Sequence, residues 1–271
     1  MKIAVTGASG RLGRAVLELA LAEGHQVTAI DRSSVVPVDR NNARSRTVDL
    51  TDYPRFLDAV ADADAVIHLA AYTSPAAAPE PVVHNNNVVA SYNALAVAEA
   101  AGITRICLAS SINAIGGVYS RQPRYDYFPL DEAHPGYAED GYSMSKWAAE
   151  QQAAAFARRL PGLSVACLRL HALRDREDLA SRLRDRPDAG SKDLWGCTPM
   201  TAAARACLNA VTRNLGGCEV FYVVASDTWR PEPSAELRDR YYPDVPVRGD
   251  LSGHKSFFDS SKAEKLLQCR L

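Results

Sequence analysis

The sequence starts with a short apolar run that leads directly into three closely spaced glycines. Ile3–Val5 precedes Gly7, Gly10 and Gly13, and apolar residues then recur at helical spacing. A strand, a glycine turn and a helix in this order let the backbone approach a pyrophosphate, because glycine has no side chain and the helix N-terminus presents free N–H groups. We therefore predict a dinucleotide-binding turn formed by Gly7, Ser9, Gly10, Arg11, Leu12 and Gly13.

The remainder of the first 170 residues alternates short apolar runs with helical patterns. This alternation is typical of βαβ units, in which each helix returns the chain to a parallel strand. It predicts an α/β fold with a Rossmann-type doubly wound parallel sheet over residues 1–170. The expected strands are 3–5, 26–30, 66–69, 105–109 and 164–170, and the expected helices are 11–23, 86–101 and 143–159.

After residue 170 the pattern weakens. A helical pattern at 200–211, a strand-like run at 220–224 and a final helix from Ser260 remain. We interpret residues 171–271 as a small substrate-binding cap that includes a return strand and a helix. The irregular segment 116–141 carries Tyr119, Tyr125, Tyr127, Phe128 and His134. These residues lie either at the mouth of the site or in the packing of a long loop, and the sequence favours neither.

Charge and cysteine usage narrow the classes of partner. The 32 acidic and 31 basic residues nearly cancel and form no basic block, which argues against nucleic acid and membrane surfaces and favours a small-molecule ligand. The six cysteines lack CxxC spacing, so we predict reduced thiols and no metal site. No signal-peptide pattern or long apolar stretch occurs, and a cytoplasmic location is expected.

An acidic residue follows the second predicted strand. Asp31 lies 24 residues after Gly7, about where a ribose-binding carboxylate belongs. A carboxylate there accepts hydrogen bonds from the ribose hydroxyls and repels a 2′-phosphate, which favours NAD. Because the cation Arg32 follows directly, NADP stays open as the less favoured cofactor.

Three residues form a candidate catalytic set. Tyr142 and Lys146 are four apart near a helix start, so their side chains share one face. Ser110 and Ser111 end a strand upstream, and Ser111 precedes Tyr142 by 31 residues. A strand end, a loop and then Tyr-x-x-x-Lys are rarely found together by chance.

With these motifs the chain resembles the extended short-chain dehydrogenase/reductase family, the NAD-dependent epimerase/dehydratase group. The resemblance runs from residue 3 to about residue 170. It implies that Tyr142 exchanges a proton with a substrate hydroxyl, that Lys146 stabilises the phenolate, and that Ser111 holds the reacting oxygen. It also implies cofactor contacts from Asp49, Leu50, Leu69, Ala70, Ala71, Asn87, Tyr142 and Lys146.

Asn87 matches the family's helix-starting Asn, and N-capping alone is an equally good explanation of it. The resemblance extends to assembly, because members commonly dimerise through two helices. Here these would be the helices at 86–101 and 143–159, which predicts a homodimer.

The substrate side is less defined. Dehydratases of this group carry an Asp-Glu pair after the catalytic Ser or Thr, whereas Ile112 and Asn113 follow Ser111 here. Length and the stretch SSINAIG resemble uronate and related sugar dehydrogenases, in which Asn and His occupy positions 112 and 113. The same resemblance makes Thr73, Asn113 and Arg174 the candidate substrate contacts, the last as a carboxylate-binding cation. Arg174 lies in the charged run RDRED, however, which is more typical of a solvated face.

Three functions remain open. The leading hypothesis is an NAD-dependent oxidoreductase that moves hydride between NAD and a hydroxyl of a sugar or sugar acid. The alternative is a sugar or nucleotide-sugar epimerase, which oxidises its substrate and then reduces it again with the same tightly held NAD. A non-catalytic NAD(H)-sensing protein is the third, although intact Ser111, Tyr142 and Lys146 argue against it.

Overall fold

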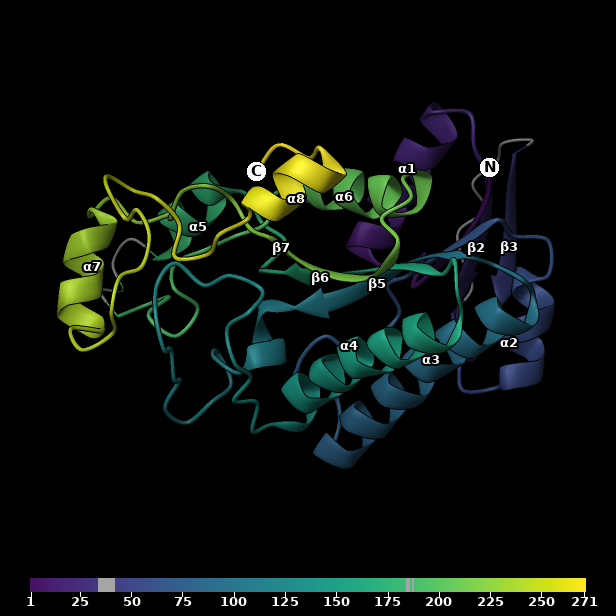
Figure 1. The fold of residues 1–271 in the computed structure, drawn as a ribbon, viewed down its shortest axis with the longest axis horizontal. Coiled ribbons are helices and arrows are strands. Elements are labelled where there is room, and N and C mark those ends of the chain that lie inside the picture. Colours follow the sequence, from purple (N-terminus) through teal and green to yellow (C-terminus); the bar gives the residue numbers. More distant parts are fainter. Residues whose placement is uncertain (34–41, 184–185, 187) are drawn as a thin grey trace.

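The computed structural model describes residues 1–33, 42–183, 186 and 188–271. Its centre is a seven-stranded parallel sheet in the order β3-β2-β1-β4-β5-β6-β7 (Figure 1). This confirms the predicted α/β Rossmann-type fold. The strands are β1 (Lys2–Thr6), β2 (Gln26–Asp31), β3 (Ala43–Thr47), β4 (Ala65–His68), β5 (Arg105–Ser111), β6 (Ser164–Leu170) and β7 (Gly217–Val223).

Helices cover both faces of the sheet (Figure 1). Residues of one face form an apolar core with α1 (Arg11–Ala22), α6 (Met200–Thr212) and α8 (Ser261–Leu267). Residues of the other face pack against α2 (Tyr53–Val60), α3 (Glu80–Ala100) and α4 (Gly141–Arg159). The inner strands are therefore apolar on both sides, which is why they appear as continuous apolar runs in the sequence.

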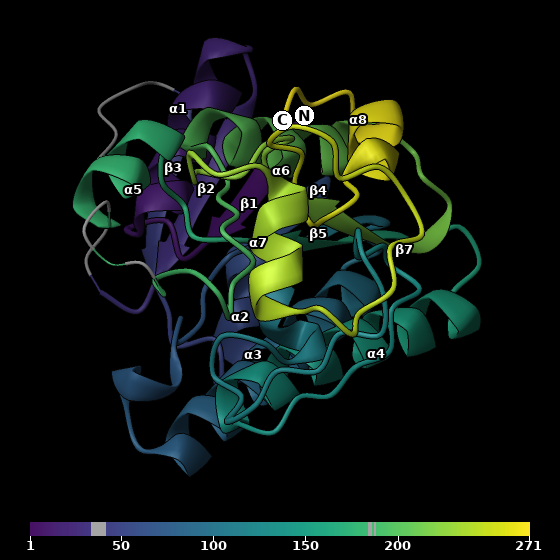
Figure 2. The same ribbon diagram turned by 90° about the vertical axis from the view of Figure 1, so that its left-hand side faces the viewer.

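A third apolar core lies beyond the carboxyl ends of β5 to β7. Its residues come from three separate segments, 112–130, 179–197 and 222–258. Short helices η2 (Ile112–Ile115), α5 (Arg176–Leu183) and α7 (Ser234–Tyr241) belong to these segments. Figure 2 views the molecule from this end, with α7 in front of the sheet.

The C-terminal hundred residues divide between these layers. β7 extends the sheet beside β6, and α6 packs against α1 on the first face. The described residues of the segments 171–199 and 224–260 lie over the strand ends together with the loop 112–140, which precedes residue 170. The domain boundary at 170 stays a prediction, and the structure locates the cap-like part in these three segments.

Several elements differ from the sequence-based expectations. α3 starts at Glu80, not near residue 86, because Pro81 fits the first helical turn, where no N–H bond is lost. β3 has the polar sequence ARSRT and lies at the sheet edge, so it lacks the apolar signal of a buried strand. None of the helices within the described ranges has the length and apolar character that a membrane span requires.

Candidate active site

Two adjoining cavities lie at the carboxyl edge of the sheet. The larger, of about 540 Å³, is lined by the glycine turn, by Ser111, Tyr142 and Lys146, and by residues of the cap segments. The smaller, of about 360 Å³, lies beside Asp31 and Asp49. Both are lined by Gly7, Gly10, Leu69, Ala71 and Thr73, so the glycine turn lies between them.

The glycine turn has the geometry expected for phosphate binding. Gly7 has φ +67°, and a Cβ there would lie 2.7 Å from the Ala70 nitrogen. A Cβ on Gly13 would lie 2.2 Å from the Gly7 oxygen, so the turn and the first turn of α1 exclude larger residues. Gly10 caps α1 without a side-chain bond, and the buried Oγ of Ser9 has no partner among the described residues. Free N–H groups and an unpaired hydroxyl fit a dinucleotide pyrophosphate.

The smaller cavity is lined by the carboxylate of Asp31. Asp31 ends β2 and accepts hydrogen bonds from the Ser9 N–H at 3.0 Å and from the Ser33 hydroxyl at 3.1 Å. Arg32 donates to the Tyr72 hydroxyl at 3.0 Å, and its guanidinium lies 4.8 Å from the centre of that ring. The cation is therefore held at the rim of the cavity, next to the carboxylate.

Asp49 and Leu50 also line this cavity. The Thr51 N–H and hydroxyl donate to Asp49 at 2.9 and 2.8 Å, and these bonds lower the pKa of the carboxyl. The buried Asn93 amide donates to the Leu50 carbonyl at 2.8 Å, which ties this part of the lining to α3. This part of the lining therefore has a polar edge and a buried apolar surface, as an adenine pocket requires.

The three candidate catalytic residues meet in the larger cavity. Ser111 is the last residue of β5, and Tyr142 lies in the first turn of α4, which Asp140 caps through the Ser143 N–H. Lys146 follows one turn later, with its Nζ 5.8 Å from the centre of the Tyr142 ring. That ammonium also donates to the Ala109 carbonyl at 2.7 Å, which fixes its place between β5 and the phenol.

Burial shifts the pKa values of Tyr142 and Lys146 in opposite directions. It raises the pKa of Tyr142 to about 12, against a hydrogen bond with Ser111 that lowers it. It lowers the pKa of Lys146 to about 8, against the opposing charge of Glu150. The phenol is thus protonated at neutral pH.

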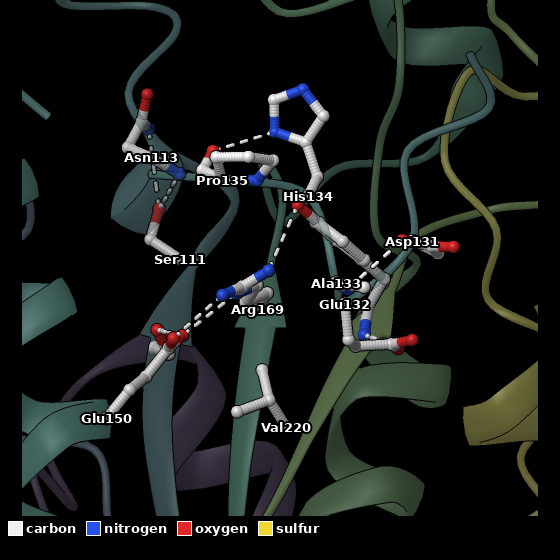
Figure 3. Close-up of polar contacts among 12 residues, drawn as sticks. Ser111, Asn113, Asp131, Glu132, Ala133, His134, Pro135, Glu150, Arg169 and Val220 are labelled. Atoms are coloured by element: carbon white, nitrogen blue, oxygen red, sulfur yellow. Dashed lines mark hydrogen bonds and ion pairs between the residues drawn. The ribbon is translucent and has the colours of Figure 1, made fainter. Parts of the chain in front are cut away.

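A buried polar network links the elements that carry Ser111, Tyr142 and Lys146. Glu150, one turn after Lys146, accepts two bonds from Arg169 at 3.0 and 2.8 Å (Figure 3). The same carboxylate accepts the Ser110 hydroxyl at 2.6 Å. The network therefore joins α4, β5 and β6 directly beneath the catalytic set.

The predicted substrate contacts occupy different places. Thr73 and Asn113 line the larger cavity, and Asn113 donates to the Ser111 hydroxyl through its backbone and its amide (Figure 3). Arg174 lies outside the lining of both cavities and pairs with Asp178 at 3.1 Å. Of the aromatic residues considered for the mouth of the site, Tyr119 lines the cavity, whereas Tyr125, Tyr127 and Phe128 are buried in the cap.

Asn87 does not start its helix. It lies in the interior of α3, so the N-capping expectation is wrong, and neither of the two cavities is lined by it. Its amide exchanges hydrogen bonds with the Tyr72 backbone at 2.8 and 3.0 Å and donates to the Ser145 hydroxyl at 3.2 Å. It thereby positions the segment that forms the wall shared by both cavities, and a direct cofactor contact stays a prediction.

The family comparison decides the class of the protein. The model of the NAD dependent epimerase/dehydratase family matches residues 3–173. The chain belongs to this family.

The proteins to which the chain is similar in sequence are named for different reactions. L-arabinose 1-dehydrogenase (NAD(P)(+)) of Haloferax volcanii is 38% identical over 41% of this chain and 41% of its own length. 2-alkyl-3-oxoalkanoate reductase of Stenotrophomonas maltophilia is 30% identical over 72% of this chain and 58% of its own. The matches thus span about two fifths and three fifths of the length of these two relatives.

The fold of the epimerase/dehydratase family recurs in solved structures. MoeE5, solved in complex with UDP-glucose and NAD, is 22% identical, with a TM-score of 0.72 over 100% of this chain and 93% of that chain. At this identity the likeness shows the shared fold, not a shared substrate. Membership of the family is shown by the family model, and the reaction of this chain must be inferred from the site.

Proposed function

We propose that this chain transfers hydride between NAD and a hydroxyl-bearing carbon of a small sugar-like molecule. The supporting observation is that Ser111, Tyr142 and Lys146 line one cavity with the phosphate turn. A protein that only sensed the cofactor would need the turn but not a buried phenol, ammonium and hydroxyl at the far end of that cavity.

Ser111, Tyr142 and Lys146 each have a separate role in the proposed oxidation of an alcohol. Ser111 donates to the reacting oxygen and holds it near the Tyr142 hydroxyl. Tyr142 accepts the hydroxyl proton, and the charge of Lys146 stabilises the phenolate that can do so. When bound, the nicotinamide supplies the hydride acceptor or donor. In the reverse direction Tyr142 returns the proton to the carbonyl oxygen.

We further propose NAD as the preferred cofactor. The Asp31 carboxylate lies at the cavity beneath the glycine turn, where it would accept the ribose hydroxyls and repel a 2′-phosphate. Arg32 stacks on Tyr72 at the rim, which provides a cation that a 2′-phosphate could reach. The carboxylate therefore favours NAD, and because of the neighbouring cation NADP is the less favoured cofactor.

The proposed assembly is a homodimer through α3 and α4. These helices lie side by side on one face (Figure 1), and Tyr92 and Trp147 on them are 46% and 47% exposed. Large aromatic side chains are enriched at interfaces between subunits. Light scattering at micromolar concentration should give twice the mass of one chain, and Trp147→Glu should give the single chain.

The decisive experiment measures NADH formation. Purified protein is mixed with excess NAD and a panel of aldoses and uronic acids, and NADH absorbance is followed, with NADP as the comparison. NADH formation with a sugar supports the dehydrogenase. If NAD binds but no panel member yields NADH, the proposal fails, and conversion of a sugar without net NADH would indicate an epimerase.

A further inference from the structure

Asp193 lies in the catalytic cavity with no assigned role. It lines the same cavity as Ser111 and Tyr142, although it is far from both in the sequence. A rigid turn carries it there, in which Leu194 and Trp195 have φ angles of 56° and 54°. Such left-handed residues are costly and persist where the surroundings fix them.

The surroundings of the turn are well determined. Trp195 is fully buried against Phe257, and its backbone N–H donates to the Gly190 carbonyl at 3.0 Å. His171 accepts the Ala172 N–H at Nδ1, so its Nε2 carries the proton and donates to the Asp193 carbonyl at 2.9 Å. The end of β6 therefore holds the Asp193 backbone in place from the opposite side.

The Asp193 carboxyl is poorly satisfied by the protein. Its Oδ1 accepts the Trp195 N–H at 3.1 Å. Within the described ranges, no side-chain hydrogen bond to it is seen and no lysine or arginine pairs with it, while the nearby His171 ring and the Asp193 backbone N–H also act on the carboxyl. Burial raises its pKa. A partly enclosed carboxyl with free acceptor positions is stabilised when a ligand supplies donors.

The charges around the cavity favour a neutral ligand. Among the described lining residues, the charged side chains besides Asp193 are Arg11 and Lys146. Arg11 begins α1 at the phosphate turn, and Lys146 is bound to the Ala109 carbonyl beside the phenol. Arg174, the expected partner of a substrate carboxylate, is paired with Asp178 outside the lining. The cap side of the cavity thus presents a carboxylate and no cation.

From this arrangement we infer that Asp193 determines specificity by accepting hydrogen bonds from hydroxyls of an uncharged polyhydroxylated substrate and by repelling one that carries a carboxylate. The inference rests on the proposed function, because it places the reacting hydroxyl at Ser111 and Tyr142. It narrows the substrate from a sugar or sugar acid to a neutral sugar.

The test uses binding and turnover together. Galactose with galacturonic acid and glucose with glucuronic acid are matched pairs that differ by a carboxylate. Their binding to the NAD-loaded wild-type protein is measured by ligand NMR, and their oxidation by NADH formation. Neutral members should bind more tightly than their acids.

Asp193→Asn keeps the shape and removes the charge. It should raise the KM and the dissociation constant for the bound neutral sugar by about 10- to 100-fold, the usual range for losing a charged hydrogen bond. NAD binding should be unchanged, and the acid should bind better than to wild type. Asp227→Asn is the matched control, because Asp227 lies in the cap outside the cavity lining and pairs with Arg176.

The outcomes separate the two proposals. If the acid binds wild type as tightly as its neutral partner, if neither binds, or if Asp193→Asn leaves sugar binding unchanged, the inference about Asp193 is overturned. If the neutral sugar binds through Asp193 but no NADH forms, the inference holds and the proposed oxidoreductase reaction fails.

Discussion

Glu150 and Arg169 form a bidentate ion pair whose side chains are 3% and 6% exposed. Removing one partner of such a pair leaves an uncompensated buried charge. We expect Glu150→Gln to lower the free energy of unfolding by about 3–5 kcal/mol, measured by urea denaturation. The double variant Glu150→Gln, Arg169→Met should recover much of this loss, and a single-variant loss below about 1 kcal/mol would show that the pair is solvated.

Tyr142→Phe tests the proton carrier. It removes the hydroxyl that we propose exchanges the proton, and it leaves the aromatic ring in place. Turnover should fall by about 100- to 10,000-fold, the usual contribution of a general acid or base, while the NAD dissociation constant stays nearly unchanged. Tyr127→Phe is the control, because that hydroxyl bonds Asp131 within the cap. Full activity of Tyr142→Phe would remove the tyrosine from the reaction.

His68 makes the fold sensitive to acid. It is buried at the end of β4 with Nδ1 2.9 Å from the Thr6 hydroxyl, and burial lowers its pKa from 6.5 to about 3. Between these values the unfolded chain binds a proton that the folded chain does not, so stability rises with pH and is lost as the pH falls below 6.5.

From about pH 7.5 to about pH 5 this difference costs about 2 kcal/mol. Urea unfolding across that range should show a smaller loss in His68→Gln than in wild type. His84→Gln, which replaces a partly exposed histidine on α3, should behave like wild type. Equal losses in all three proteins would contradict the assignment.

Asp31→Ala tests the cofactor preference. In the proposed cofactor site, loss of the carboxylate would remove the acceptor for the ribose hydroxyls and the repulsion of a 2′-phosphate, while Arg32 stays on Tyr72. The ratio of kcat/KM for NADP to that for NAD should rise by about 10- to 100-fold, as expected for one charge-assisted hydrogen bond. Adding Arg32→Ala should remove the gain. An unchanged ratio would place the selectivity elsewhere.

Local signals predicted most strands of residues 1–170. β1, β2, β4, β5 and β6 are buried on both faces, so their apolar runs stand out in the sequence. The spacing of Ser111, Tyr142 and Lys146 places them on one strand end and one helix turn, which neighbouring residues determine.

Tertiary relationships were not predictable in the same way. Asp193 and His171 reach the cavity through a left-handed turn and a strand end that are joined by one hydrogen bond, and no sequence spacing records that bond. The polar strand β3 becomes a strand because β2 offers an edge to pair with. The start of α3 depended on whether Pro81 ends a loop or begins a helix.

The position of α6 and β7 bears on how this protein could be re-engineered. Ala203 and Cys207 of α6 and Phe221 of β7 are fully buried in the same core as Val16 and Ala20 of α1. A fragment ending at residue 170 would expose this face of the sheet, so residues 1–170 are not expected to fold as an independent unit. Chimeras with altered substrate range should instead graft the three discontinuous segments 112–140, 171–199 and 224–260 onto an intact sheet.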